Sequence, residues 1–456
     1  MPAVEEALAG TVGVKPEVVE AVAEAIDGSE LSRADALLAD LHDADLADLV
    51  ENLGPEHRRA VVEILRNRFP PGILPELDES VRDAVVDQLG PKDLATAIAK
   101  LESDDALYLI QDLQEAQRSQ VLHAIPAALR RILEEQLAFP EASAGRLMSR
   151  DFVAVPSYWT VGECIDSFRE SKDLPEDFYD IYVVDPRHRP VGTVPLNRLV
   201  RSTRPTKVGD IMDAELRPVP ATMNQEDVAF LFKQQDLVSA PVVDPSGRLI
   251  GTITVDDVVD VIEEEAEKDL LHLGGVGETD IHAPVAGTVW RRIRWLVVTL
   301  INTLIASSVI SQFEATLQQM VALAILMPIV AAMGGNAGMQ VVTVTVRALA
   351  TRDLTPANAL RVVSKEVVVG IANGVFFAAI MGTIAALWFH SSALGGVLAA
   401  AMVFNMAWAG LAGIMIPLLI ARMGHDPAIV AGPFLTTTTD VLGFFAFLGL
   451  ATWVLL

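Results

Sequence analysis

One carboxylate stands alone in the last apolar stretch of the chain. Asp440 follows the run Thr436-Thr-Thr-Thr439, and no other ionisable residue lies between Pro427 and the C-terminus. A carboxylate in the middle of a membrane-length segment costs about 3 kcal/mol unless it faces water, a partner or an ion. We therefore favour an ion-pathway residue over a protonated or internally hydrogen-bonded aspartate, and we expect it to bind the transported metal.

Other polar groups of the apolar half could line the same pathway. The segment from Pro328 to Gln340 contains three glycines around Asn336 and would break an ordinary lipid-facing helix. Weakened backbone at membrane depth is tolerated beside a water-filled cavity, whereas small residues also serve close helix packing. We expect four residues to line a pore, although any single amide could instead join two helices: Asn336, Asn405, Thr436 and Thr439.

A second set of carboxylates precedes the apolar half. On a 3.6-residue period, Asp257, Asp260 and Glu264 share one face of a predicted helix. Carboxylates one turn apart can hold a hard divalent cation, directly or through its waters. An ordinary solvated helix face has the same appearance, so the spacing alone leaves both interpretations open.

Five apolar stretches must position these groups in the membrane, at residues 295–310, 320–346, 367–389, 394–420 and 428–456. Each approaches or exceeds the roughly 20 residues that a spanning helix needs. The acidic N-terminus lacks a signal sequence, so we expect it in the cytoplasm. All eight later basic residues then fall on the cytoplasmic side, as the positive-inside rule requires, which places the C-terminus outside. Five helices contain no two-fold internal repeat, which suggests a pore formed between subunits.

The charge is concentrated in the part of the chain before the membrane. Residues 1–286 hold 55 acidic and 26 basic residues, a formal charge of −29, against +3 for residues 287–456. This sign opposes nucleic-acid binding. It stores self-repulsion that counter-cations can relieve, although solubility explains part of it.

Two repeats organise this acidic half. Residues 30–138 read as short amphipathic helices, with Gly54-Pro55 and Gly90-Pro91 at junctions, and predict a small α-solenoid. Residues 146–262 hold two copies of a strand, turn, strand and helix pattern that resembles a pair of cystathionine-β-synthase (CBS) domains. Thr254 and Asp257 of the second copy fit the family's ribose-contacting pattern, which implies ATP at the pair; the first copy has Arg198 in place of the aspartate.

The single cysteine, Cys164, excludes an intrachain disulfide and a cysteine-rich zinc site. It lies on an amphipathic helix that begins near Thr160, and we expect it in the core. The membrane half also lacks His-Glu-x-x-His, which a regulated intramembrane metalloprotease needs, and a buried cation suited to an anion channel. The sequence therefore predicts a transport protein and no enzyme.

Together these parts resemble the MgtE family of bacterial magnesium channels over nearly the whole chain. The motifs that carry the resemblance are 328–340 (PIVAAMGGNAGMQ), 347–353 (RALATRD), 426–428 (DPA) and 439–443 (TDVLG). The resemblance implies a homodimer in the inner membrane, with Mg²⁺ as both substrate and regulator and lipid as its surroundings. It also implies a cytoplasmic sensor that closes the pore through a plug helix.

The resemblance carries metal-binding roles to eight carboxylates of this chain, namely Asp104, Asp236, Asp257, Asp260, Glu265, Asp269, Asp426 and Asp440. Two positions depart from the family pattern. Lys268 replaces a plug glutamate, so a salt bridge to Asp426 could take the place of an ion. Gly72 falls where a solenoid glutamate would join Asp236 and Asp260.

We therefore expect a multidomain fold: a helical solenoid at 1–140, CBS domains at 141–205 and 206–262, an acidic connecting helix and linker at 256–285, and five membrane helices at 286–456. The expected function is a Mg²⁺-selective, Mg²⁺-gated channel for magnesium uptake. The alternative is a secondary transporter that exchanges Mg²⁺ or Co²⁺ for Na⁺ or H⁺, although such carriers commonly show internal repeats.

Overall fold

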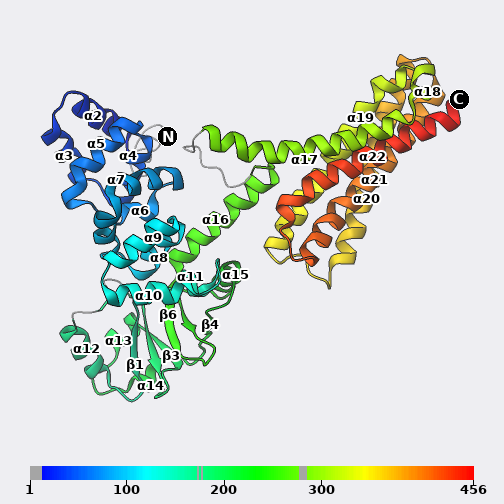
Figure 1. The fold of residues 1–456 in the computed structure, drawn as a ribbon. Coiled ribbons are helices and arrows are strands. Elements are labelled where there is room, and N and C mark those ends of the chain that lie inside the picture. The colour runs from blue at the N-terminus through cyan, green and yellow to red at the C-terminus, as the bar shows by residue number, and fades with distance from the viewer. Residues whose placement is uncertain (1–12, 172–173, 176–177, 277–284) are drawn as a thin grey trace, which may run out of the picture. The chain divides into compact units, whose positions relative to one another are not determined.

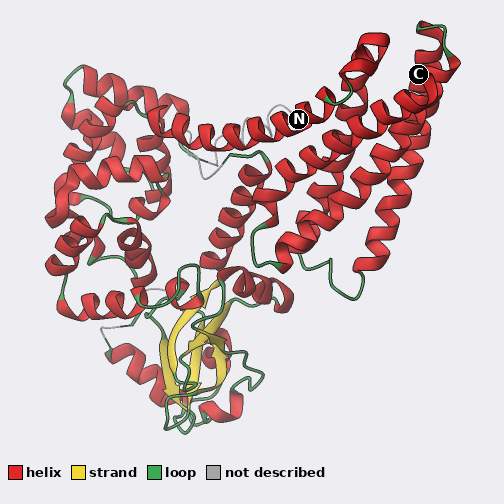
Figure 2. Cartoon of the chain, turned by 45° about the vertical axis from the view of Figure 1, so that its right-hand side comes forward, coloured by secondary structure: helices red, strands yellow, loops and turns green. Residues whose placement is uncertain are grey.

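The computed structural model describes residues 13–171, 174–175, 178–276 and 285–456 (Figure 1). The chain forms two compact units, and the boundary between them falls within helix α16, after Glu264. Helices build both units, and the first also contains two small sheets (Figure 2). Five helices of the second unit are long and apolar enough to cross a membrane. The predicted fold class is confirmed.

The solenoid is a stack of short helices around one apolar core. Gly54 precedes α5, where Pro55 supplies the pre-set φ of a first helical residue. Gly90 has φ 74° and kinks α7 just before Pro91, so both Gly-Pro pairs do mark junctions. The helices are α2 (Pro16–Asp27), α3 (Leu31–Ala39), α4 (Asp43–Asn52), α5 (Pro55–Leu65), η1 (Arg66–Arg68), α6 (Ile73–Glu76), α7 (Glu79–Ile98), α8 (Ser103–Asp112), α9 (Glu115–Ala124) and α10 (Ala127–Leu137).

Each CBS copy contributes one three-stranded sheet, in the orders β1-β2-β3 and β4-β5-β6. The first two strands of each sheet run parallel and the last two antiparallel, and both copies carry a register shift at the same place, between Val183 and Val184 and between Val242 and Val243. The strands are β1 (Val153–Pro156), β2 (Asp180–Val184), β3 (Pro190–Pro195), β4 (Val219–Pro220), β5 (Ser239–Val243) and β6 (Leu249–Thr254).

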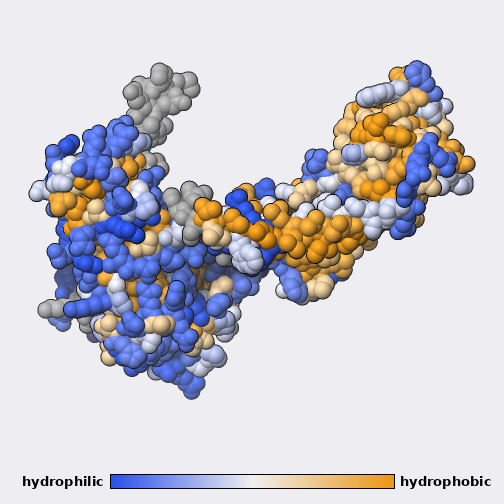
Figure 3. Space-filling model, turned by 45° about the horizontal axis from the view of Figure 1, so that its top comes forward, coloured by the Kyte–Doolittle hydropathy of each residue, from blue (hydrophilic) through white to orange (hydrophobic). Residues whose placement is uncertain are grey.

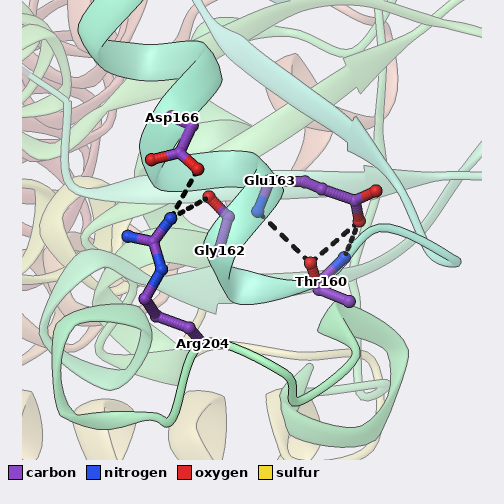
Figure 4. A network of polar contacts seen from close by, with 5 residues as sticks. All are labelled: Thr160, Gly162, Glu163, Asp166 and Arg204. Atoms are coloured by element: carbon purple, nitrogen blue, oxygen red, sulfur yellow. Dashed lines mark hydrogen bonds and ion pairs between the residues drawn. The ribbon is translucent and has the colours of Figure 1, made fainter.

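Short helices cover these sheets: α11 (Ala144–Leu147), α12 (Val161–Glu170), α13 (Leu196–Arg201), α14 (Val208–Ile211) and α15 (Gln225–Gln235). Helix α12 begins as predicted, because Thr160 and Glu163 form a reciprocal capping box at its first turn (Figure 4). The Arg204 guanidinium donates to Asp166 on the same helix (Figure 4). Cys164 is fully buried, which confirms its place in the core.

The second unit contains the end of α16 (Val255–Leu273), the short α18 (Glu314–Gln319) and the five spans. The spans are α17 (Val285–Ser311), α19 (Ala322–Ala350), α20 (Ala359–Trp388), α21 (Ser392–Arg422) and α22 (Pro427–Leu455). Their outer surface is mostly hydrophobic, whereas hydrophilic residues dominate the CBS and solenoid surface (Figure 3).

The expectation of a broken second span was wrong. Helix α19 runs without interruption through Pro328 and the glycine run. Its glycines instead admit neighbouring side chains, because a Cβ at Gly334 would lie 2.1 Å from the Asn405 Nδ2 and one at Gly338 would lie 2.9 Å from Leu435. Close packing, the alternative explanation, accounts for these small residues.

Candidate functional site

The threonine run before Asp440 satisfies its own helix. Thr436, Thr437 and Thr439 donate their hydroxyls to carbonyls four residues earlier, at 3.0, 2.7 and 3.0 Å. Internal bonding of this kind is what a polar side chain needs where water is absent. Asp440 lies near the middle of α22 and is half-buried. Among the described residues, no hydrogen bond or ion pair holds its carboxylate, so it is free to meet an ion.

The four residues predicted to line a pore divide into two pairs. Asn336 on α19 and Thr436 on α22 are exposed on the protomer. Asn405 and Thr439 are 0% exposed. Asn405 on α21 donates from Nδ2 to the Val330 carbonyl at 2.9 Å, so it joins two helices, the alternative that its sequence left open.

The sensor candidates of the first unit meet where the first turn of α8 faces the first turn of α16. The Asp257 carboxylate accepts from the amide and the hydroxyl of Thr254, at 3.0 and 2.7 Å, and the Asp104 side chain lies next to it. Asp104 Oδ1 is buried and has no protein hydrogen-bond partner. Two of the predicted metal-binding carboxylates are therefore in contact.

We call Glu102, Asp104, Asp105, Asp256 and Asp257 the α8 cluster. Burial, followed by repulsion from neighbouring carboxylates, raises the pKa of Glu102, Asp104 and Asp105. Desolvation is the largest cause for Glu102, whose pKa rises to about 7 with help from Asp151, and for Asp105, whose pKa rises to about 6. Burial likewise raises the pKa of Asp104 well above its ordinary value, with Asp257 the next cause. A raised pKa means that these carboxyls hold their protons more tightly than usual, so protons and a cation compete for the same oxygens near neutral pH.

The expectation at Gly72 needs correction. A Cβ there would lie against the Asp43 carboxylate, so a side chain at this position would have to displace that carboxylate. Glu76, one turn later on α6, supplies the acidic neighbour of Asp260 instead, and burial together with Asp260 raises the pKa of Glu76. Asp236 is exposed, in the left-handed conformation after α15 with φ 51°.

A third acidic group lies where the end of α16 packs in the second unit. Asp426 caps α22 by accepting from the Ala428 amide at 2.7 Å, and its other oxygen contacts His272 Nδ1 at 3.0 Å. Desolvation, with Asp426 and then Glu265 as further causes, raises the pKa of Asp269. Leu273 packs into the core made by α19, α21 and α22.

Lys268 does not take the place that we considered for it. Its ammonium lies 3.9 Å from Glu265 Oε1, one turn earlier on the same helix. Asp426 is instead held by His272, which is 8% exposed. Sequence reasoning missed His272 because a single histidine shows no ligand spacing. It also missed three carboxylates, because ordinary solvated helix faces carry such residues: Glu76, Glu102 and Asp105. Within the described residues, no three acidic, histidine or cysteine side chains are close enough to hold a metal as a set.

A cavity of about 930 Å³ opens between the CBS copies. Its lining includes Tyr179, Asn197 and Arg201 of the first copy and Asp236 and Ser239 of the second. Thr254 and Asp257, predicted to contact a nucleotide, are not among its lining residues; they bond each other at the start of α16.

These parts define a class of protein: a multi-pass membrane protein with an acidic half that holds a CBS pair. Sequence profiles agree part by part. A divalent cation transporter profile, MgtE, matches residues 327–450, the MgtE intracellular N domain matches 41–142, and CBS domains match 144–203 and 208–264.

The magnesium transporter MgtE of Thermus thermophilus is 33% identical over 439 residues, which cover 95% of this chain and 97% of that protein. MgtE of Bacillus subtilis is 28% identical over 91% of this chain and 93% of that protein. The chain therefore belongs to the MgtE family of magnesium transporters.

A solved structure described as the cytosolic domain of the Mg²⁺ channel MgtE in complex with ATP is 30% identical. The match covers 53% of this chain and 99% of the solved chain, with a TM-score of 0.49.

Proposed function

We propose that the protein is a Mg²⁺-selective channel that works as a homodimer in the bacterial inner membrane. The observation that carries this proposal is the half-buried, unpartnered carboxylate of Asp440 in the middle of an apolar helix. Mg²⁺ dehydrates reluctantly and is usually held by one or two carboxylates through its waters. Two copies of Asp440 at a dimer axis suit a hydrated divalent ion, and an odd number of spans supports a pore between subunits.

The exposed polar residues Asn336 and Thr436 then line the path of the hydrated ion. Asn405 and Thr439 support it from behind, because they are buried within the protomer. The N-terminus faces the cytoplasm and the C-terminus the exterior, supported by the basic residues near the start of α17, the end of α19, the start of α20 and the end of α21.

Gating follows from the acidic groups on either side of the unit boundary. We propose that Mg²⁺ bridges the α8 cluster and the Glu76–Asp260 group in the first unit, and Glu265, Asp269 and Asp426 at the end of α16. Repulsion among these carboxylates opposes the closed arrangement, and bound cations relieve it. Helix α16 belongs to both units, so it is the element through which the sensor can bias the pore.

The CBS pair is proposed to bind ATP in the 930 Å³ cavity, beside Thr254 and Asp257 rather than on them. The volume lies in the range of small-molecule sites, and Arg201 and Tyr179 offer a cation and a ring for phosphates and a base. Arg201→Ala should weaken ATP binding to the detergent-purified protein, measured by calorimetry, whereas Arg187→Ala, outside the cavity lining, should not.

The decisive test of the channel is flux through Asp440→Asn, which keeps the shape of the side chain and removes its charge. Dye-reported Mg²⁺ entry into proteoliposomes should fall to background while the protein stays dimeric. Glu314→Gln removes an exposed carboxylate from α18 and serves as the matched control. Undiminished, still selective Mg²⁺ flux in the Asp440 variant would disprove the pore assignment, and unitary currents would separate a channel from an exchanger.

A further inference from the structure

A buried serine at the start of α8 is the centre of a dense group of hydrogen bonds. The amide and the hydroxyl of Ser103 donate to the same oxygen of Asp151, at 3.1 and 3.0 Å. The hydroxyl also accepts from the Arg150 amide at 2.7 Å and lies 3.4 Å from the Ser149 hydroxyl. Ser103 is 3% exposed, whereas Asp151 is exposed, so these bonds are half-buried. We call residues Ser103, Ser149, Arg150 and Asp151 the clamp.

The clamp joins the two chain segments that carry the predicted sensor carboxylates Asp104 and Asp257. Ser149 exchanges both backbone hydrogen bonds with Thr252 of β6, at 2.8 and 2.9 Å. Strand β6 leads directly into Thr254 and Asp257, and Ser103 is followed at once by Asp104. Asp104 and Asp257, whose side chains are neighbours, are therefore connected through the clamp and strand β6.

Electrostatics oppose this contact. Glu102, Asp104 and Asp105 at the start of α8 face Asp256 and Asp257 at the start of α16. Burial is the first cause that raises the pKa of Glu102 and Asp105, and the charges of Asp257 and Asp256 raise it further. Like charges at such a contact push the solenoid away from the CBS pair. The Ser103 bonds to Asp151 are charge-assisted and half-buried, since Ser103 is buried and Asp151 exposed. They act against that push and need no cation.

We propose that Ser103 and Asp151 are positioning residues of the sensor: their clamp holds α8 on the CBS pair and presets Asp104 against Asp257. This inference rests on the proposed Mg²⁺ gating and deepens it. The clamp contributes part of the free energy of the closed sensor, so it lowers the Mg²⁺ concentration at which the channel closes.

Four variants of the full-length protein test the clamp. Asp151→Ala removes the acceptor of both Ser103 bonds, and Ser103→Ala removes the hydroxyl alone. Asp151→Asn keeps a side-chain oxygen that can accept from Ser103. Arg150→Ala removes a side chain but keeps the backbone amide that donates to the Ser103 hydroxyl. The Mg²⁺ concentration for half-closure in proteoliposomes should rise about fivefold in Asp151→Ala and less in Ser103→Ala. It should stay within about twofold of wild type in the two conservative variants.

Hydrogen exchange supplies a readout that does not depend on flux. Amides of residues 103–107 in the full-length protein without Mg²⁺ should exchange faster in Asp151→Ala than in wild type, and at the wild-type rate in Arg150→Ala. Unchanged exchange and unchanged half-closure in Asp151→Ala would overturn the clamp. If wild-type flux shows no Mg²⁺-dependent closure, the gating proposal fails, and the exchange comparison still decides whether the clamp holds α8.

Discussion

His272 gives the end of α16 an anchor that needs no ion. Its imidazole is almost fully buried and lies 3.0 Å from Asp426, the residue that caps α22. Replacing one partner of such a bond removes about 1 kcal/mol, which is about a fivefold shift in a two-state population. We therefore expect His272→Ala to raise the Mg²⁺ concentration for half-closure about fivefold, measured by flux into proteoliposomes.

Lys268→Ala is the control for this prediction, because the ammonium lies beside Glu265 and not beside Asp426. Its effect on half-closure should be small, since surface ion pairs contribute little. A larger shift in Lys268→Ala than in His272→Ala would contradict the assignment of His272 as the anchor.

The single thiol offers a second test at this scale. Burial raises the pKa of Cys164 to about 11, with Glu163 as a further cause. Because the thiolate is the reactive form, native protein at pH 7.5 should resist maleimide for hours. Mass spectrometry checks this, with the exposed Gln120→Cys as a reactive control. Rapid labelling of Cys164 before unfolding would show that the apolar core of the first CBS copy does not bury it.

Helices α20 and α21 pack closely because glycines, which have no side chain, lie at their contact. A Cβ at Gly395 would lie 2.4 Å from the Gly382 carbonyl oxygen and 2.8 Å from the Ala386 Cβ, whereas a Cβ at Gly396 would meet nothing within 4 Å. Gly395→Ala should therefore lower the detergent melting temperature by several degrees, and Gly396→Ala should leave it unchanged or raise it slightly. Equal melting temperatures in the two variants would contradict this packing.

The elements that sequence predicted well were the long ones. All five spans were predicted within about five residues of their centres, because segments of about 20 mostly apolar residues are typical of membrane-spanning helices. Strands β1 and β4 were missed, since they have four and two residues and gain their pairing only from β2 and β5. The continuity of α19 was missed because the reason for its glycines lies on α21 and α22.

Functional residues, like helices and strands, could be predicted where the signal is local in the sequence and not where it depends on distant contacts. Asp440 could be identified from sequence because it is the one ionisable residue of a long apolar segment, and the segment itself shows this. The contact of Asp104 with Asp257, the substitution of Glu76 for Gly72, and the role of Ser103 depend on residues far apart in the chain. A lone serine or glutamate on a helix shows none of these contacts in its own sequence.

At the scale of the whole chain, the charge of −29 before residue 287 links proton binding to stability. Glu102 and Asp105 have folded-state pKa values of about 7 and about 6, both raised by burial first. Their unfolded values lie near 4, so the folded state binds more protons between pH 4 and 7. A raised pKa gives stability that is complete below the unfolded value and is lost as pH rises through the folded value.

The first unit should therefore melt at a higher temperature at pH 6 than at pH 8 when EDTA removes divalent ions. Saturating Mg²⁺ should raise the melting temperature more at pH 8, because the cation then meets carboxylates that have already lost their protons. Scanning calorimetry of the full-length protein at both pH values, with and without Mg²⁺, measures the two effects. The double variant Glu102→Gln, Asp105→Asn should flatten the pH dependence and shrink the Mg²⁺ effect together. A variant that loses one effect and keeps the other in full would show that protons and Mg²⁺ do not compete for the α8 cluster.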